Sequence, residues 1–155
     1  ILGYWTNSSG VHLTDSDPAS MEECMRAALK DAGIHAADVE HISAHATATE
    51  TGDQAEAAAT HRVYGYETPV TALKGHMGHT LGASGAVETI ASILMGREGF
   101  MAHTLNLTQP DPAFPTLNHI MKEPLGKGFI VGVNNSFAFG GVNTSLVIKN
   151  FPSSR

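Results

Sequence analysis

Cysteine, charge and long apolar runs are all scarce in this sequence, and each shortage excludes a class of protein. The 155 residues include one cysteine, Cys24, so no internal disulfide can form, and we expect a reducing, cytoplasmic location. No apolar run approaches the length that spans a membrane. The net charge of -6 argues against nucleic acid or an anionic membrane as the main partner. Charged residues make up only 15% of the chain, which suggests that another protein covers part of its surface.

The sequence also lacks a clear nucleophile. Cys24 is the only thiol, and its spacing with Met21, Met25 and Ala28 puts it on the apolar face of a predicted helix. A thiol on such a face is inert, because burial among apolar groups disfavours the thiolate. We therefore expect Cys24 to be structural.

Hydrophobic periodicity predicts strands that alternate with helices, followed by two adjacent strands. We expect Ser20 and Glu23 to form a capping box at the start of the first helix and Gly33 to end it. The predicted strands are 1–6, 39–44, 69–73, 129–133 and 145–149, and the predicted helices are 20–33, 53–64 and a third from about 80. This order is typical of a layered α/β fold, and the length suits a single domain over residues 1–155.

Polar residues gather where three of these strands end. His45 follows the second predicted strand, Lys74 and His79 follow the third, and the polar segment 134–143 follows the fourth. Sites in α/β sheets form at the carboxyl ends of strands, so we expect these groups to converge. Neutral imidazoles at such a site can donate to a thioester oxygen as it becomes an enolate, which indicates acyl chemistry. Glu88, in the helix that follows His79, could reach back toward Lys74.

The same residues resemble a known family. Three ordered motifs carry the resemblance: HATAT at 45–49 with Gly52, Asp53 and Glu56; Lys74 with 78–79 and 82–85; and NSFAFGGVN at 135–143. They are similar to the carboxy-terminal half of the β-ketoacyl-acyl carrier protein synthases of the elongating, Cys-His-His type. The resemblance covers essentially the whole chain and implies a thiolase-like layered α/β/α lobe.

The resemblance also implies catalytic roles for four residues. His45 and His79 match the two histidines that bind the malonyl thioester and promote its decarboxylation. Lys74 matches the lysine that supports them electrostatically, and Glu88 matches the ion-pair partner of that lysine. The active cysteine of the family lies in the amino-terminal half, which these 155 residues do not include.

Substrate-binding roles follow in the same way. Phe139 matches a gating phenylalanine whose backbone N–H contributes to an oxyanion hole, and Gly140 is next to it in that loop. Thr47 and Thr49 match threonines of the pantetheine tunnel, as does Thr14. The resemblance implies no cofactor, since the substrates are carried on the phosphopantetheine of an acyl carrier protein. It implies one further partner, which is either the amino-terminal half or a partner ketosynthase chain, within a dimeric enzyme.

Four positions depart from the family pattern. The family usually has glycine where Ala46, Ala48 and Ala138 stand, and threonine where Val142 stands. Each added Cβ or lost hydroxyl narrows or stiffens a loop that moves in the family, so these changes bear on acyl-chain range and gating.

Two rival functions remain open. The chain could be a non-catalytic partner lobe like the family's chain-length factors, although those tend to lose the histidines and the lysine that are retained here. A metal-dependent hydrolase built on His76 and His79 is the other, but no acid or thiol shows clear ligand spacing, and we expect no metal site. The remaining histidines are scattered and are expected on surfaces: His12, His35, His41, His61, His103 and His119.

Overall fold

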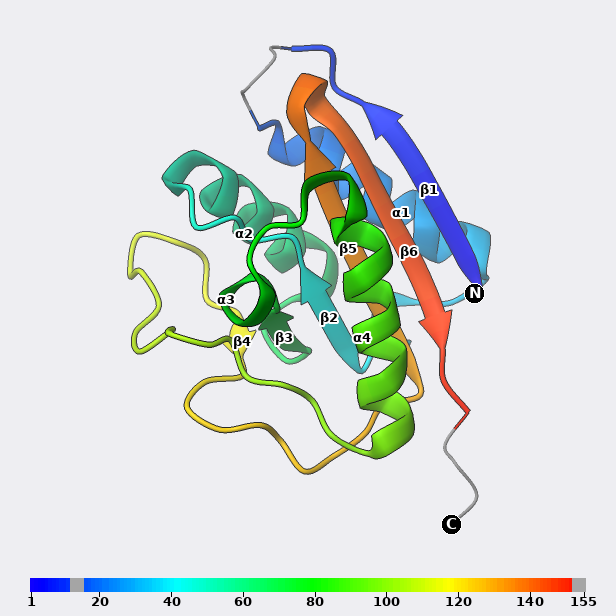
Figure 1. Ribbon diagram of the computed structural model, residues 1–155. Helices are drawn as coiled ribbons and strands as arrows, with labels where there is room; N and C mark the ends of the chain where they lie inside the picture. The colour runs from blue at the N-terminus through cyan, green and yellow to red at the C-terminus, as the bar shows by residue number, and fades with distance from the viewer. Residues whose placement is uncertain (12–15, 152–155) are drawn as a thin grey trace.

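A mixed β-sheet forms the centre of the computed structural model, which describes residues 1–11 and 16–151 (Figure 1). Its six strands lie in the order β1-β6-β5-β2-β3-β4. The strand β2 pairs in parallel with β3 and β5, and β6 runs antiparallel to both β5 and β1. The bounds are β1 Gly3–Ser8, β2 His41–Ala44, β3 Pro69–Ala72, β4 Asn118–His119, β5 Val131–Ala138 and β6 Val142–Lys149.

Helices cover both faces of this sheet, which confirms the α/β/α layering. The helices α1 (Pro18–Ala32) and α2 (Glu50–Tyr64) contact each other on one face, and α4 (Ser84–Glu98) crosses the other face (Figure 1). A single turn of helix, α3 (Lys74–Met77), links β3 to α4. No helix of the described segments is long and apolar enough to cross a membrane.

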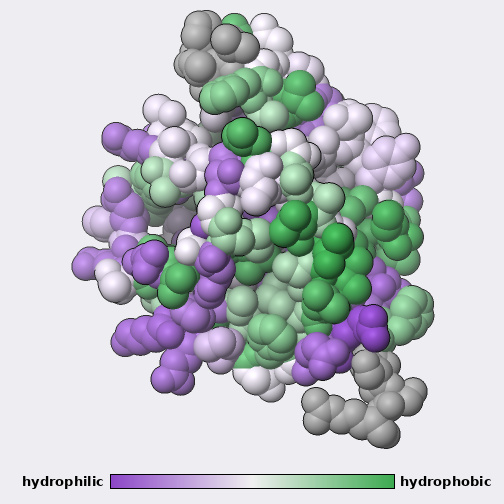
Figure 2. Space-filling view, in the orientation of Figure 1, coloured by the Kyte–Doolittle hydropathy of each residue, from purple (hydrophilic) through white to green (hydrophobic). Residues whose placement is uncertain are grey.

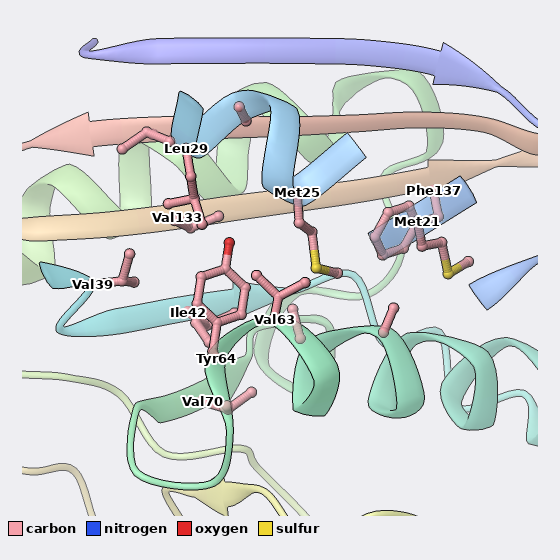
Figure 3. Packing of buried hydrophobic residues seen from close by; sticks show 14 of the residues in the cluster. Met21, Met25, Leu29, Val39, Ile42, Val63, Tyr64, Val70, Val133 and Phe137 are labelled. Carbon is pink, nitrogen blue, oxygen red and sulfur yellow. The ribbon is translucent and has the colours of Figure 1, made fainter. Parts of the chain in front are cut away.

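Two apolar cores lie on the two faces of the sheet. The larger one joins α1 and α2 to the strands through side chains that include Met25, Ile42 and Val133, where the last two are direct partners across β2 and β5 (Figure 3). The smaller one includes Leu73, Met95 and Ile148 on the α4 side. Because neighbouring strand residues point to opposite faces, Val147 enters the first core and Ile148 the second.

The first helix begins earlier than predicted. Asp17, not Ser20, is its N-cap: the Asp17 side chain accepts hydrogen bonds from the backbone N–H of Ala19 and Ser20, and Pro18 takes the first helical position. The end at Gly33 is confirmed, with a left-handed φ of 68°. Cys24 is fully buried, its thiol donates to the Trp5 carbonyl, and burial raises the pKa of that thiol to about 11.

The predicted strands 129–133 and 145–149 left the segment 134–143 outside the sheet, and this was wrong. The strand β5 continues to Ala138 and β6 starts at Val142, so most of the segment is hairpin. Its buried Asn143 is hydrogen-bonded to residues far away in the sequence. Asn143 Nδ2 donates to Asn7 Oδ1 and to Ser20 Oγ, each at 3.0 Å. Such pairing lets polar residues occupy a buried strand.

The surface position predicted for His41 was also wrong. His41 is fully buried, and its ring stacks on Phe129 with 4.5 Å between centroids. Its Nε2 lies 3.1 Å from Thr71 Oγ1, and that hydroxyl donates to the Ala102 carbonyl, so the imidazole donates to Thr71. Burial lowers the pKa of His41 to about 3. His35 is exposed as predicted, whereas His12 lies outside the described residues.

Three large apolar side chains of α4 face outward. The buried residues of the helix are Ser84, Glu88, Ser92, Met95 and Gly96, while Val87, Ile90 and Leu94 are 36%, 58% and 48% exposed. Figure 2 shows the resulting apolar surface over α4. A helix usually buries its apolar stripe, so this arrangement is typical of a surface that another protein covers.

Candidate active site

The sheet brings the predicted site residues together at one edge. Because β2 and β3 are parallel neighbours, His45, directly after β2, lies beside Lys74, two residues after β3. His79 follows in the turn before α4, and its ring centroid is 5.4 Å from that of His45, nearly perpendicular to it. The convergence predicted for these three residues is therefore confirmed.

Lys74 and Glu88 form a buried ion pair within this cluster. Lys74 Nζ lies 2.5 Å from Glu88 Oε1, and the two side chains are only 7% and 1% exposed. Burial raises the pKa of the Glu88 carboxyl, and the hydrogen bond and charge of Lys74 act against this rise. The contact predicted between these residues is present, and each charge compensates the other in a site largely closed to water.

Lys74 also determines which nitrogen of His45 carries the proton. Its ammonium donates to the His45 carbonyl and lies 3.3 Å from His45 Nδ1. An ammonium can only donate, so Nδ1 must accept, and the proton of the neutral ring sits on Nε2. Burial, then the charge of Lys74 and the neighbouring His79, lower the pKa of His45 to about 3. At neutral pH His45 is therefore an uncharged Nε2–H donor.

The turn that carries His45 is strained and is held by Glu56. Ala46 and Ala48 have φ values of 34° and 60°, a region that costs a residue with a Cβ about 1–2 kcal/mol. The Glu56 carboxylate accepts from the backbone N–H of His45 at 2.8 Å and of Ala46 at 2.7 Å. Burial raises the pKa of Glu56 to about 7 although both bonds lower it. Glu56 was singled out only as part of the motif that begins at His45, and no local sequence signal indicates its contact with the His45 backbone.

Two further contacts were not predicted. Ser84 Oγ lies 3.0 Å from His79 Nδ1, and the ring of Phe137 lies 6.1 Å from that of His45, centroid to centroid. The alternating pattern of β5 could have indicated Phe137, since it points to the same face as Asn135 and away from Ala138.

The residues predicted to bind substrate lie in two turns. Thr47 and Thr49 are in the turn before α2, with their hydroxyls 3.0 Å apart. Phe139 and Gly140 form the tight turn between β5 and β6, where Phe139 is 77% exposed and Gly140 has a left-handed φ of 79°. Thr14 lies outside the described residues.

A cavity of about 640 Å³ lies between α2, β3 and the proline-rich connection 104–117, and it borders the turn that carries His45, since Ala46 and Glu56 line it. None of the predicted catalytic residues lines it. Across residues 1–11 and 16–151, no group of three or more His, Cys, Asp or Glu side chains is arranged to hold a metal ion.

The cluster has the groups needed to stabilise a negative charge on oxygen. Two imidazoles from adjacent turns lie edge to face, and one of them is fixed as a neutral N–H donor beside a buried cation. Preorganised donors in a site with little water are far more effective than the same groups in solution. The geometry therefore fits a reaction in which an enolate or oxyanion develops between the rings.

Comparison with known proteins identifies the family. Residues 1–108 match the family described as "Beta-ketoacyl synthase, C-terminal domain". The chain is 36% identical over 154 residues to 3-oxoacyl-[acyl-carrier-protein] synthase 2 of Coxiella burnetii, covering 96% of this chain and 37% of that protein.

Solved structures agree with this result. A β-ketoacyl synthase from Burkholderia phymatum STM815 superposes with a TM-score of 0.95 at 41% identity, covering 97% of this chain and 37% of that one. The ishigamide ketosynthase/chain length factor superposes with a TM-score of 0.93 at 33% identity, covering 97% of this chain and 38% of that one. The fold is thiolase-like. The chain belongs to the β-ketoacyl synthase family and spans less than two fifths of the length of these relatives.

Proposed function

We propose that this chain is the carboxy-terminal half of a β-ketoacyl-acyl carrier protein synthase and supplies the decarboxylation machinery of that enzyme. The observation that carries the proposal is the meeting of His45 and His79, 5.4 Å apart, beside the buried Lys74–Glu88 pair. The nucleophilic cysteine comes from an amino-terminal half outside these 155 residues. The substrates are thioesters on acyl carrier protein, in fatty acid or polyketide synthesis.

After the acyl group has passed from its carrier thioester to the cysteine of the other half, with the carrier thiol as leaving group, the first step of elongation is loss of carbon dioxide from the malonyl thioester. The bond between C2 and the carboxylate breaks, and its electron pair moves into the thioester to give an enolate. The thioester oxygen accepts hydrogen bonds from Nε2–H of His45 and of His79, which stabilise the charge as it forms. Lys74 supports this step by keeping the proton of His45 on Nε2.

The second step is the condensation. C2 of the enolate attacks the acyl carbonyl carbon on the cysteine of the other half, and the resulting oxyanion accepts from the backbone N–H of Phe139. Collapse expels the cysteine thiolate and leaves a β-ketoacyl thioester. Phe139 and Gly140 lie in a tight, exposed turn, where a small backbone change would move the aromatic ring as a gate. Thr47 and Thr49, at the rim, would bind the pantetheine arm.

The outward apolar face of α4 supports the need for another half. Val87, Ile90 and Leu94 would pack against it, as the covered inner surface of a two-lobed enzyme. A non-catalytic lobe of the chain-length-factor kind is the alternative, and a ketosynthase/chain length factor structure is among the similar folds. Retention of the complete His45, His79 and Lys74 cluster favours the catalytic role.

The test is complementation. The chain alone should neither take up an acyl group nor carry out the condensation, because Cys24 is buried and its raised pKa keeps the thiol protonated. Co-expression with an amino-terminal ketosynthase half should give acyl loading, seen by intact mass, and condensation. Acyl loading on Cys24 of the isolated chain would contradict the proposal, as would a reconstituted pair that loads but never releases carbon dioxide.

A further inference from the structure

Ser84 connects the start of α4 to the imidazole of His79. It is the first residue of α4 and is 4% exposed, and its Oγ lies 3.0 Å from Nδ1 of His79. Thr80 Oγ1 is 3.2 Å from the same Ser84 Oγ. The backbone N–H of Leu81 also points at His79 Nδ1, at 3.3 Å. Two groups of this turn therefore converge on Nδ1 of His79, and a third, the Thr80 hydroxyl, bonds to one of them.

The chemistry of these groups fixes the direction of each hydrogen bond. A backbone N–H can only donate, so Leu81 makes Nδ1 of His79 an acceptor without a proton. The Ser84 hydroxyl can then donate to the same nitrogen and accept the hydrogen of Thr80. The chain of donation runs from Thr80 to Ser84 to His79. Of the two donors to Nδ1, the Ser84 hydroxyl at 3.0 Å is closer than the Leu81 N–H at 3.3 Å, so Ser84 makes the stronger hydrogen bond.

We propose that Ser84 is a positioning residue that holds His79 as its Nε2–H tautomer. The catalytic relevance of this tautomer rests on the function proposed above, whereas the hydrogen bond itself does not. Ser84 acts on His79 as Lys74 acts on His45: each donates to Nδ1 and leaves Nε2–H for another acceptor. Both donors come from the segment 74–84, so one strand-to-helix connection sets the proton positions of both rings.

No other side chain in the described part of the chain, and no water, could easily take over the hydrogen bond that the Ser84 hydroxyl makes to His79. An alanine at position 84 would leave Nδ1 with Leu81 alone, and the ring would have less to keep its proton on Nε2. The partly buried Thr80 hydroxyl would also lose its acceptor. Ser84 sits where α4 comes close to the sheet, so water has little access to replace the lost hydroxyl.

The tautomer is measurable in this chain without any assay of catalysis. Long-range ¹H–¹⁵N spectra give the Nδ1 and Nε2 shifts of His79, which report the share of each tautomer. The wild type should show Nε2–H predominating. Ser84→Ala should lower the ratio of Nε2–H to Nδ1–H about fivefold, the equivalent of one neutral hydrogen bond.

Two control variants distinguish an effect of the Ser84 hydroxyl on His79 from a general change in the structure of α4. Ser92→Ala removes a hydroxyl that is also buried on the sheet side of α4 but far from His79, and it should leave the His79 shifts unchanged. Ser84→Thr keeps the hydroxyl and should keep the wild-type ratio. The proposal would be overturned if, in folded Ser84→Ala, the ratio of the Nε2–H to the Nδ1–H tautomer of His79 stays within about twofold of the wild type.

Activity of the complete enzyme then distinguishes this inference from the proposed function. With both correct, Ser84→Ala lowers carbon dioxide release about fivefold and Ser84→Thr restores it. A changed tautomer with an unchanged rate supports the hydrogen bond and contradicts the catalytic role proposed for His79. An unchanged tautomer contradicts only the role of Ser84.

Discussion

The Lys74 ammonium lies 3.3 Å from Nδ1 of His45, in a position where it can only donate. The same ammonium nitrogen is 2.5 Å from the buried carboxylate of Glu88. One cation therefore fixes the proton of a histidine and neutralises a carboxylate that burial disfavours. Because both functions depend on one side chain, its loss should affect stability as well as chemistry.

Replacing Lys74 alone should be strongly destabilising. Lys74→Met leaves the Glu88 charge buried without its partner, and breaking such a pair typically costs about 3–5 kcal/mol. Replacing both residues with methionine removes the unpaired charge, so the double variant should be more stable than Lys74→Met. Urea unfolding of the three proteins measures this. A double variant no more stable than the single one would show that the ion pair is not the cause.

The pH dependence of Lys74→Met provides a second check. The folded-state pKa of Glu88 is already raised by burial, and loss of Lys74 removes the group that opposes the rise. A raised folded-state pKa means that the folded protein binds the proton more tightly than the unfolded chain. The loss of unfolding free energy in Lys74→Met, relative to the wild type, should therefore become smaller as the pH falls and Glu88 becomes protonated. A difference in unfolding free energy between the two proteins that stays constant from neutral to acid pH would contradict this.

His41 should make the fold sensitive to acid. Its pKa falls from the ordinary histidine value of 6.5 to about 3 in the fold, so the unfolded chain binds more protons between these values. The stability that His41 confers is complete above pH 6.5 and is lost as the pH falls toward 3, by at most about 1.4 kcal/mol per pH unit. His41→Gln keeps a donor for Thr71 but does not titrate. The stability difference between wild type and His41→Gln should narrow from pH 7 to pH 4.5, and a constant difference would contradict this account.

The apolar side of α4 should cause self-association of the isolated chain. Ile90→Gln with Leu94→Gln makes two exposed positions polar without touching the core, so the melting temperature should change little. Dye binding to apolar surface and sedimentation should both report less association than in the wild type. Ala86→Gln, at an exposed small residue of the same helix, is the matched control. If the double variant associates as strongly as the control, self-association does not depend on Ile90 and Leu94, and the prediction is wrong.

Much of the site could be predicted from the sequence because its residues directly follow strands. His45 and Lys74 each come within two residues of a strand end, and parallel neighbours place such positions side by side. The layered fold followed from the alternation of strands and helices. Cys24 could be placed on a buried face by helical spacing alone.

Contacts between distant residues could not be predicted in this way. His41 looked like a surface residue because its partners, Thr71 and Phe129, are 30 and more residues away. Asn143 looked like a loop residue because nothing nearby shows that Asn7 and Ser20 will pair with it. Asp17 is different: Pro18 at the first helical position was a local signal for it, and the capping box at Ser20 was the weaker interpretation.

Release of labelled carbon dioxide from a malonyl thioester tests the central claim most directly. In the complete enzyme, His45→Ala and His79→Ala should each lower this release by about a hundredfold or more, since each removes one donor to the developing enolate oxygen. Acyl loading of the cysteine, followed by mass spectrometry, should fall much less. His76→Ala, which removes a histidine bonded to the His103 carbonyl outside the cluster, is the control and should keep both rates. Wild-type carbon dioxide release in His45→Ala and His79→Ala would contradict the catalytic account and favour a non-catalytic partner lobe.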